Sequence, residues 1–223
     1  PRAPAGSPPA KVSAAGRECA LGVPKDAAWR AAALNRLEPL VRDALSFDGL
    51  LGDDRAALYA ALVRAREDAG DSAGARTVAE AWQTFLDQDA ARAPCAEARS
   101  ALDGYRVTAA LELGDPARAL PALQASERDL PDDYNPPARL AVVLRELRRY
   151  DEALAAVDRA LARAYGPRKL GIFDSKATIL EKKGDRAAAK TTLLDALTYA
   201  STLPEAQRSK GMTARLEKHL QLL

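Results

Sequence analysis

The sequence has few of the residues on which most catalytic and metal chemistry depends. Among 223 residues there are one histidine, one methionine and two cysteines. Cys19 and Cys95 are far apart and neither belongs to a Cys-x-x-Cys pair, which excludes the zinc and thiol-redox sites that need closely spaced ligands. We expect two unpaired thiols. A single Cys19–Cys95 disulfide, which would matter in an exported protein, stays open as the alternative.

The only histidine, His219, lies near the C-terminus, two residues after Glu217. No Ser–His–Asp or Cys–His arrangement can be built around it, so we expect a solvated surface histidine. No Gly-x-x-x-x-Gly-Lys-Ser/Thr or Gly-x-Gly-x-x-Gly phrase offers a cradle for phosphate. The sequence therefore predicts a non-catalytic protein, without catalytic residues, metal site or cofactor.

Long apolar runs and a strong net charge are also missing. The longest wholly apolar run, 56–63, has eight residues, whereas a membrane span needs about 20. The net charge is only +2, and this near balance disfavours nucleic acid as a partner. Residues 51–162 carry 14 basic and 20 acidic groups, and residues 163–223 carry 12 and 6. We interpret the basic end as a solvated face, with an acidic protein or nucleic acid as alternatives.

What the sequence does contain is typical of a helical protein. Hydrophobic residues make up 48%, glycine is sparse and only 5% of residues are aromatic, which suits helices with an apolar core. Residues 1–16 are rich in Pro, Ala, Gly and Ser and are expected to form a flexible tail or linker. We expect a soluble protein, cytoplasmic or exported after removal of an N-terminal signal.

An internal repeat is the strongest signal in the chain. Its four copies close on alanines at positions 75, 119, 153 and 189, at intervals of 44, 34 and 36 residues. The first interval contains an insertion of ten residues around Gln88 to Glu97. Each copy is a Gly-Asp-x-x-x-Ala phrase or a relative of it: Gly70–Ala75, Gly114–Ala119, Arg148–Ala153 and Gly184–Ala189.

Each phrase has the chemistry of a tight joint between two helices. Glycine ends one helix, because it adopts the left-handed conformation without a steric penalty. The aspartate that follows caps the next helix by accepting hydrogen bonds from its free N–H groups. The closing alanine allows two helices to cross closely. One-sided apolar stripes on both sides of the joints support this prediction.

At these residues the chain resembles the tetratricopeptide-repeat (TPR) family, whose period is 34 residues. The second unit departs from the pattern because Asp103 replaces the usual aromatic residue. The resemblance implies an all-α, right-handed solenoid of about four helix pairs with a capping helix at each end. It is carried best by the third unit, at Leu140, Ala141, Leu144, Tyr150, Ala153, Val157 and Ala160.

The resemblance also sets the predicted domain boundaries. The repeats occupy 54–203, divided into 54–94, 95–133, 134–169 and 170–203. The expected capping helices lie at 26–52, starting at Asp26, and at 204–223. A solenoid end needs a polar outer face, and we expect both capping helices to present one.

In such a solenoid the first helix of each pair lines the concave side, which implies a groove for a protein or peptide partner. The Arg and Tyr residues at these positions favour a segment with acidic character. The oligomeric state is left open. The inward positions that the resemblance implies are Arg64, Tyr105, Thr108, Arg139, Val142, Arg145, Asp174 and Thr178, together with Ala60 and Ser175.

A second resemblance concerns residues 130–141 and 164–170. These stretches look like the helical C-terminal part of certain bacterial proteins that begin with a thioredoxin-like domain. Two functions follow as hypotheses. The first is a non-catalytic interaction scaffold with a concave groove. The second is a helical module that supports a missing N-terminal thioredoxin-like, thiol-disulfide domain.

Overall fold

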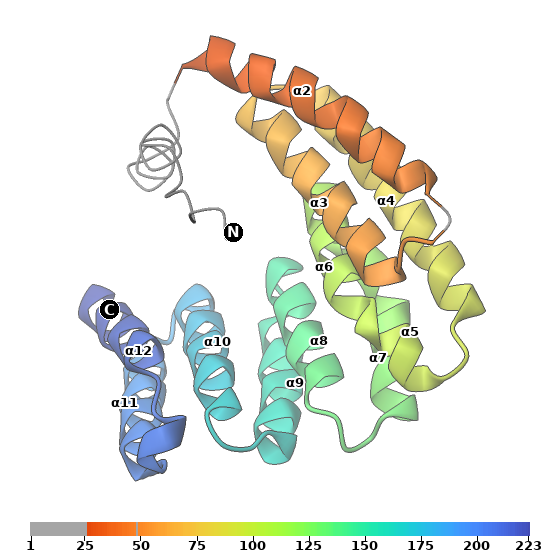
Figure 1. Cartoon of the computed structure of the whole chain (residues 1–223). Coiled ribbons are helices and arrows are strands. Elements are labelled where there is room, and N and C mark those ends of the chain that lie inside the picture. Colours follow the sequence, from red (N-terminus) through yellow and green to blue (C-terminus); the bar gives the residue numbers. More distant parts are fainter. Residues whose placement is uncertain (1–25, 48) are drawn as a thin grey trace, which may run out of the picture.

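The computed structural model describes residues 26–47 and 49–223, and within this part of the chain all regular structure is helical. The tail expected at 1–16 and Cys19, and with it the Cys19–Cys95 alternative, lie outside the described residues. The helices follow one another as antiparallel neighbours and build an open arc (Figure 1). The all-α solenoid predicted from the repeats is thus confirmed.

The arc begins with α2 (Ala27–Ser46), followed by the pair α3 (Gly52–Asp68) and α4 (Ser72–Arg92). The short α5 (Ala96–Ala101) then leads to α6 (Asp103–Glu112) and, through the 3₁₀ turn η1 (Pro116–Ala119), to α7 (Leu120–Asp129). The remaining helices are α8 (Asn135–Glu146), α9 (Tyr150–Arg163), α10 (Arg168–Lys183), α11 (Arg186–Thr202), the 3₁₀ turn η2 (Glu205–Gln207) and α12 (Lys210–Leu222).

The core is a continuous strip between neighbouring helices rather than a single centre. Buried apolar side chains form three adjoining groups, around Trp82 near the N-terminal end, Val157 in the middle and Leu193 near the C-terminal end. Ala153 and Ala189 are completely buried at the joints. Because each helix buries a one-sided stripe, each pair depends on its neighbours for a full core.

The joints use the predicted chemistry, with two departures. Gly70, Gly114 and Gly184 have φ of 80°, 69° and 97°, in the left-handed region. Asp71 and Asp185 accept hydrogen bonds from the N–H groups of Gly74 and Ala188.

The two departures lie at the second and third joints. Asp115 does not cap a helix with its side chain; it pairs instead with Arg118 at 3.3 Å, and the chain enters a 3₁₀ turn. At the third joint Arg148 takes the place of glycine, with φ of 59°. A non-glycine residue is strained in this conformation.

The two end helices differ in their outer faces. On α12, Leu216 is fully buried and Met212 and Leu220 pack beside it. On α2, Leu34 and Val41 are buried, but Trp29 and Leu40 remain 49% and 69% exposed. The expectation of a polar outer face is therefore wrong for α2, because its sequence carries apolar residues on more than one side.

The strain at Arg148 leads to a stability prediction. Replacing Arg148 with Gly should raise the free energy of unfolding by on the order of 1 kcal/mol, because glycine enters the left-handed region without a Cβ penalty. The reciprocal change, Gly184→Arg, should lower it by a similar amount, since open space surrounds Gly184 and only its backbone conformation opposes a side chain. Chemical denaturation measures the free energy of unfolding of both variants. If neither value differs from that of the unchanged chain, the role given to the joint is contradicted.

Candidate functional site

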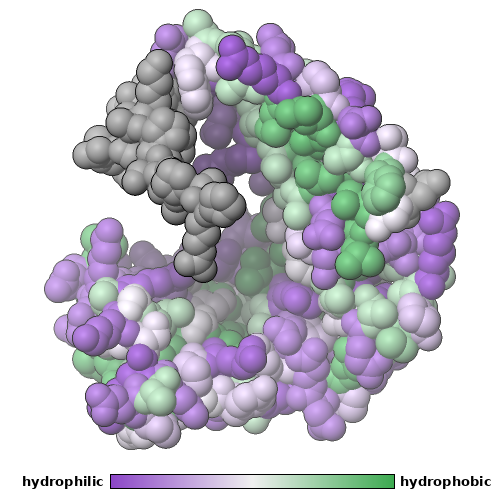
Figure 2. Space-filling model, viewed as in Figure 1, coloured by the Kyte–Doolittle hydropathy of each residue, from purple (hydrophilic) through white to green (hydrophobic). Residues whose placement is uncertain are grey.

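The hollow of the arc is bordered by α3, α6, α8 and α10, with α12 at its C-terminal end (Figure 1). The space-filling view shows an open hollow lined by both polar and apolar surface (Figure 2). The residues predicted to line a groove lie on these first helices. Their surroundings divide them into open positions and positions already used in packing.

The open positions lie mainly on α3, α6 and α8. Arg64 is exposed and its Nε lies 3.6 Å from Oδ1 of Asp68. Thr108 is exposed, and its hydroxyl donates to the carbonyl of Gly104 at 3.1 Å. Val142 is half-buried on α8, one turn before Arg145. Arg145 donates to Glu146 at 2.7 Å and keeps 20% of its side chain exposed.

Two predicted positions serve the packing between repeats instead. Tyr105 packs within the N-terminal part of the core, where its ring lies 6.2 Å from that of Trp82. Arg139 reaches from α8 across to α5, where its Nη1 donates to the carbonyl of Ser100 at 3.0 Å. Both side chains therefore link neighbouring helix pairs.

Asp174 is the clearest correction to the predicted groove. It is only 4% exposed, because α12 covers this part of α10. Its carboxylate forms an ion pair with Arg215, with Oδ2 2.7 Å from Nη2, and its Oδ1 lies 2.7 Å from Nδ1 of His219. Thr178, one turn further along α10, donates to the Asp174 carbonyl at 2.9 Å. Helix α12 thus covers the C-terminal end of the predicted groove.

The prediction that His219 is a solvated surface residue is wrong. Its side chain is 17% exposed, and its second ring nitrogen, Nε2, lies 3.4 Å from Glu181. The signal that could have revealed this is the four-residue spacing of Arg215 and His219. That spacing puts both on one face of α12, next to the apolar stripe through Leu216.

A buried polar cluster stands where the repeat pattern has an aromatic residue. Asp103 is fully buried, and its Oδ1 lies 3.5 Å from Nη1 of Arg106. Arg106 is itself buried and also reaches Asp87 and the Leu86 carbonyl, each at 3.3 Å. Burial raises the pKa of the Asp103 carboxyl, and Ser126, Arg106 and Arg139 offset this only in part. Removal from water disfavours the charged form of a carboxyl group, which raises its pKa.

Acidic groups also lie beside the open arginines. Burial, and next the neighbouring carboxylate of Glu67, raise the pKa of Glu112, while Arg64 lowers it. Arg64 therefore faces acidic groups from both α3 and α6. The arginines of the predicted groove have acidic or carbonyl neighbours within this chain, which weakens the expected preference for an acidic ligand.

The basic C-terminal end is partly neutralised as well. Lys176 pairs with Asp158 at 2.7 Å and Lys183 with Asp151 at 2.5 Å. Lys169 lies over the ring of Tyr199, 5.9 Å from its centroid. These contacts join α10 to α9 and α11, so much of the positive charge takes part in holding the repeats together.

The described residues were compared with the requirements of two classes of feature, metal sites and membrane-spanning helices. In residues 26–47 and 49–223, no cluster of three or more His, Cys, Asp or Glu side chains has the arrangement of a metal site. Over the same ranges, none of the helices combines the length and apolar character needed to cross a bilayer.

The contact between α12 and α10 gives a second prediction. His219→Ala should lower the free energy of unfolding by about 1–3 kcal/mol, because the buried Asp174 loses a partner. Lys218→Ala, an exposed change on the same helix, should have almost no effect. Chemical denaturation compares the two; equal stability of both variants would contradict the closing role of α12.

The buried carboxyl gives a third prediction, on pH. A folded-state pKa above the unfolded value means that the folded protein binds more protons, so stability falls as pH rises from about 4 through the raised pKa. Relative to Asp103→Asn, the unchanged protein should therefore lose stability over this range. Denaturation curves at several pH values measure the difference, with exposed Asp132→Asn as control. Parallel pH profiles would contradict the assignment.

Comparisons with known proteins place the fold but not the function. No profile of a known family matches the sequence, and no curated protein is significantly similar to it. Among solved structures, BtubC from P. vanneervenii is 16% identical over 81% of this chain and 80% of its own, with a TM-score of 0.52.

Two further structures have lower TM-scores. YrrB, described as a TPR protein with an unusual peptide-binding site, is 19% identical over 87% of this chain and 93% of its own, with a TM-score of 0.48. MamA from Desulfovibrio magneticus RS-1 is 15% identical over 81% and 97%, with a TM-score of 0.45. The repeated joints, the stacked helix pairs and the likeness to BtubC together identify the fold as a TPR-like α-helical solenoid.

Proposed function

We propose that this chain is a non-catalytic interaction scaffold that holds a peptide or a segment of a partner protein in the hollow of the arc. The single observation that supports it is the set of first-helix side chains that remain wholly or partly accessible in the hollow. Arg64 and Thr108 are exposed, and Val142 and Arg145 are partly so. A rigid helical framework that presents such side chains along a concave face suits the binding of an extended partner.

The environment of the open arginines defines the kind of partner segment. Arg64 lies among Asp68, Glu67 and Glu112, and Arg145 is paired with Glu146. Such mixed charge favours a ligand that carries both acidic and basic groups rather than an acidic one. Val142 and Thr108 offer small apolar and polar contacts between the two charged regions.

Photo-crosslinking in the native host tests the proposal. A benzophenone amino acid replaces Thr108 in the hollow or Thr198 on the outer α11, which is a matched position. Both threonines are exposed, and each hydroxyl donates to a carbonyl four residues earlier. We expect position 108 to capture a specific protein that position 198 does not. Capture of the same proteins at both positions, or of no protein at position 108, would contradict the proposed groove.

A paired substitution then tests the chemistry of the captured complex. Arg64→Ala/Arg145→Ala should reduce the captured amount several-fold, because arginines often dominate the energy of an interface. Lys182→Ala/Lys190→Ala, at exposed positions on the basic end, serves as control. Arg139 is unsuitable for this test, because it donates to Ser100 and its removal disturbs packing between repeats.

A further inference from the structure

A cleft between α2, α3 and α4 lies apart from the hollow. It consists of a cavity of about 610 Å³ and an adjoining one of about 400 Å³, which share Tyr59 and Ala81 in their walls. Tyr59 and Arg64 are five residues apart on α3, which turns them about 140° away from each other around the helix. The cleft therefore opens on a different face of this helix pair from the groove proposed above.

The cleft exists because α4 is long. It has 21 residues, compared with 14 in α9 and 17 in α11, and its last turns belong to the ten-residue insertion seen in the sequence. The smaller cavity lies beside the last turn of α2, at Leu45 and Ser46. The larger cavity has no residue of α2 in its wall. The final turns of α4 thus extend past the end of α2 and leave α3 uncovered there.

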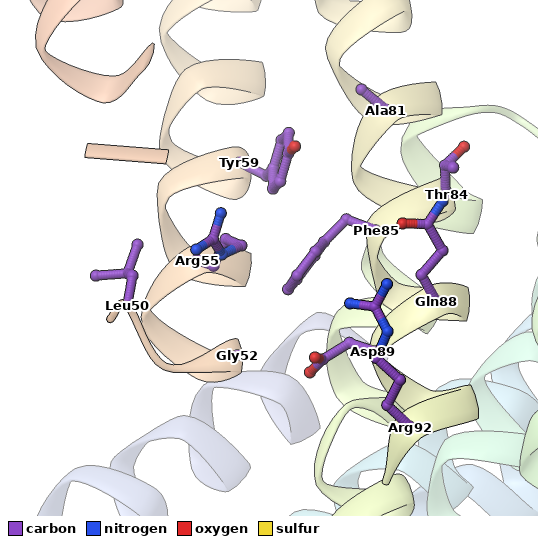
Figure 3. A pocket seen from close by; sticks show the side chains of 10 residues that line it. All are labelled: Leu50, Gly52, Arg55, Tyr59, Ala81, Thr84, Phe85, Gln88, Asp89 and Arg92. Atoms are coloured by element: carbon purple, nitrogen blue, oxygen red, sulfur yellow. The ribbon is translucent and has the colours of Figure 1, made fainter. Parts of the chain in front are cut away.

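The floor of the cleft is aromatic and apolar. The rings of Tyr59 and Phe85 stack with centroids 5.7 Å apart, and both face the space between α3 and α4 (Figure 3). Leu50, in the loop after α2, lines the larger cavity, and Phe47 and Leu51 of the same loop are 66% and 71% exposed. Apolar surface extends over α2 and α3 as far as this loop (Figure 2). Contiguous exposed apolar surface of this kind marks interaction sites.

Positive charge surrounds this apolar floor. Among the residues that the structure describes, the walls contain Arg42, Arg55 and Arg92 but only one carboxylate, that of Asp89. Asp89 lies directly against Gly52, at the first turn of α3. The N-cap of this helix, Leu51, supplies no side-chain hydrogen bond, so the carboxylate serves the positive end of the helix dipole.

The three arginines of the cleft differ in the hydrogen bonds and ion pairs that they make within the chain. Arg55 donates to the carbonyls of Leu45 and Phe47, and Arg42 pairs with Glu38. Arg92, in the last turn of α4, has no carboxylate within ion-pair distance among the residues that the structure describes. It is therefore the cation at the open end of the cleft that is left for a ligand.

From these observations we propose that the cleft binds an amphipathic helical segment of a partner protein. The segment places an aromatic or branched aliphatic side chain beside Tyr59 and Phe85 and an acidic residue against Arg92. Between Thr77 and Gln88 the cleft follows α4 for about 16 Å, the length of a three-turn helix. Such a helix would continue α2 along the outer side of α3 and α4.

The charge of the cleft distinguishes this occupant from the chain's own beginning. Residues 1–25 contain Arg2, Lys11, Arg17 and Lys25 against the single acid Glu18. A segment of that charge is repelled by the arginines of the cleft. An acidic partner is attracted instead, and buried contacts of its apolar side chain supply the affinity. The proposal is independent of the groove in the hollow.

Fluorescence polarisation with two designed 14-residue helical peptides provides the test, using the full chain. Both carry Leu and Phe along one face; one has glutamates at its C-terminal end and the other lysines. We expect the acidic peptide to bind at least about tenfold more tightly than the basic one. Ala81→Trp, which fills the floor, and Arg92→Glu should each weaken binding at least about tenfold.

Matched controls separate the cleft from general effects. Ala155→Trp places the same side chain on an exposed position of α9, and Arg128→Glu reverses a last-turn arginine of α7. Both should bind the acidic peptide as the unchanged chain does. Equal binding of the two peptides, or equal losses in the controls, would overturn the proposal.

Two rival occupants give distinct results. If deletion of residues 1–25 strengthens peptide binding about tenfold or more, the chain's own beginning occupies the cleft and the proposal falls. Sedimentation of the chain without peptide tests the second rival. Self-association that Ala81→Trp abolishes would assign the cleft to a second copy and likewise overturn the proposal.

Discussion

The structure depends on the close crossing of paired helices at a small residue. Ala75, Ala119, Ala153 and Ala189 are all buried where two helices meet. An alanine lets the helix axes approach, and the apolar stripes on either side then interlock with those of the next pair. Because no pair buries its stripe alone, the array is stable only as a stack. The hollow and the cleft are consequences of how the stack curves and where it is interrupted.

The apolar stripe of a terminal helix pair has no further pair to cover it, and the two ends of the stack cover this stripe to different extents. At the C-terminal end α12 inserts Leu216 into the core and ties down Asp174 through Arg215 and His219. At the N-terminal end α2 covers α3 but leaves Trp29 and Leu40 exposed. The closed end limits the hollow, whereas at the other end α4 extends past α2 and leaves the cleft beside Tyr59 and Phe85 open.

Electrostatics in the middle of the stack follow from one unusual residue. Asp103 stands at a position where the repeat pattern has an aromatic side chain, and a buried carboxyl needs cationic neighbours. Arg106 lies against it, and Arg139 bridges the same region to the next pair. Arg139, which was predicted to line the groove, is in part a counter-charge of this buried acid. The hollow is consequently less basic than the residue types along it indicate.

The sequence by itself determined the fold class, because the apolar period and the Gly-Asp joints are local signals that survive without tertiary context. Gly70, Gly114 and Gly184 could be assigned to left-handed turns, and Ala153 and Ala189 to crossings, from spacing alone. Only the tertiary structure decided which side chains remain free. Asp174 and His219 are 45 residues apart and meet because α12 folds back over α10, and Tyr59 and Phe85 form a cleft because α4 extends past α2. Contacts of this range depend on helix length and crossing angle, which a repeat pattern does not specify.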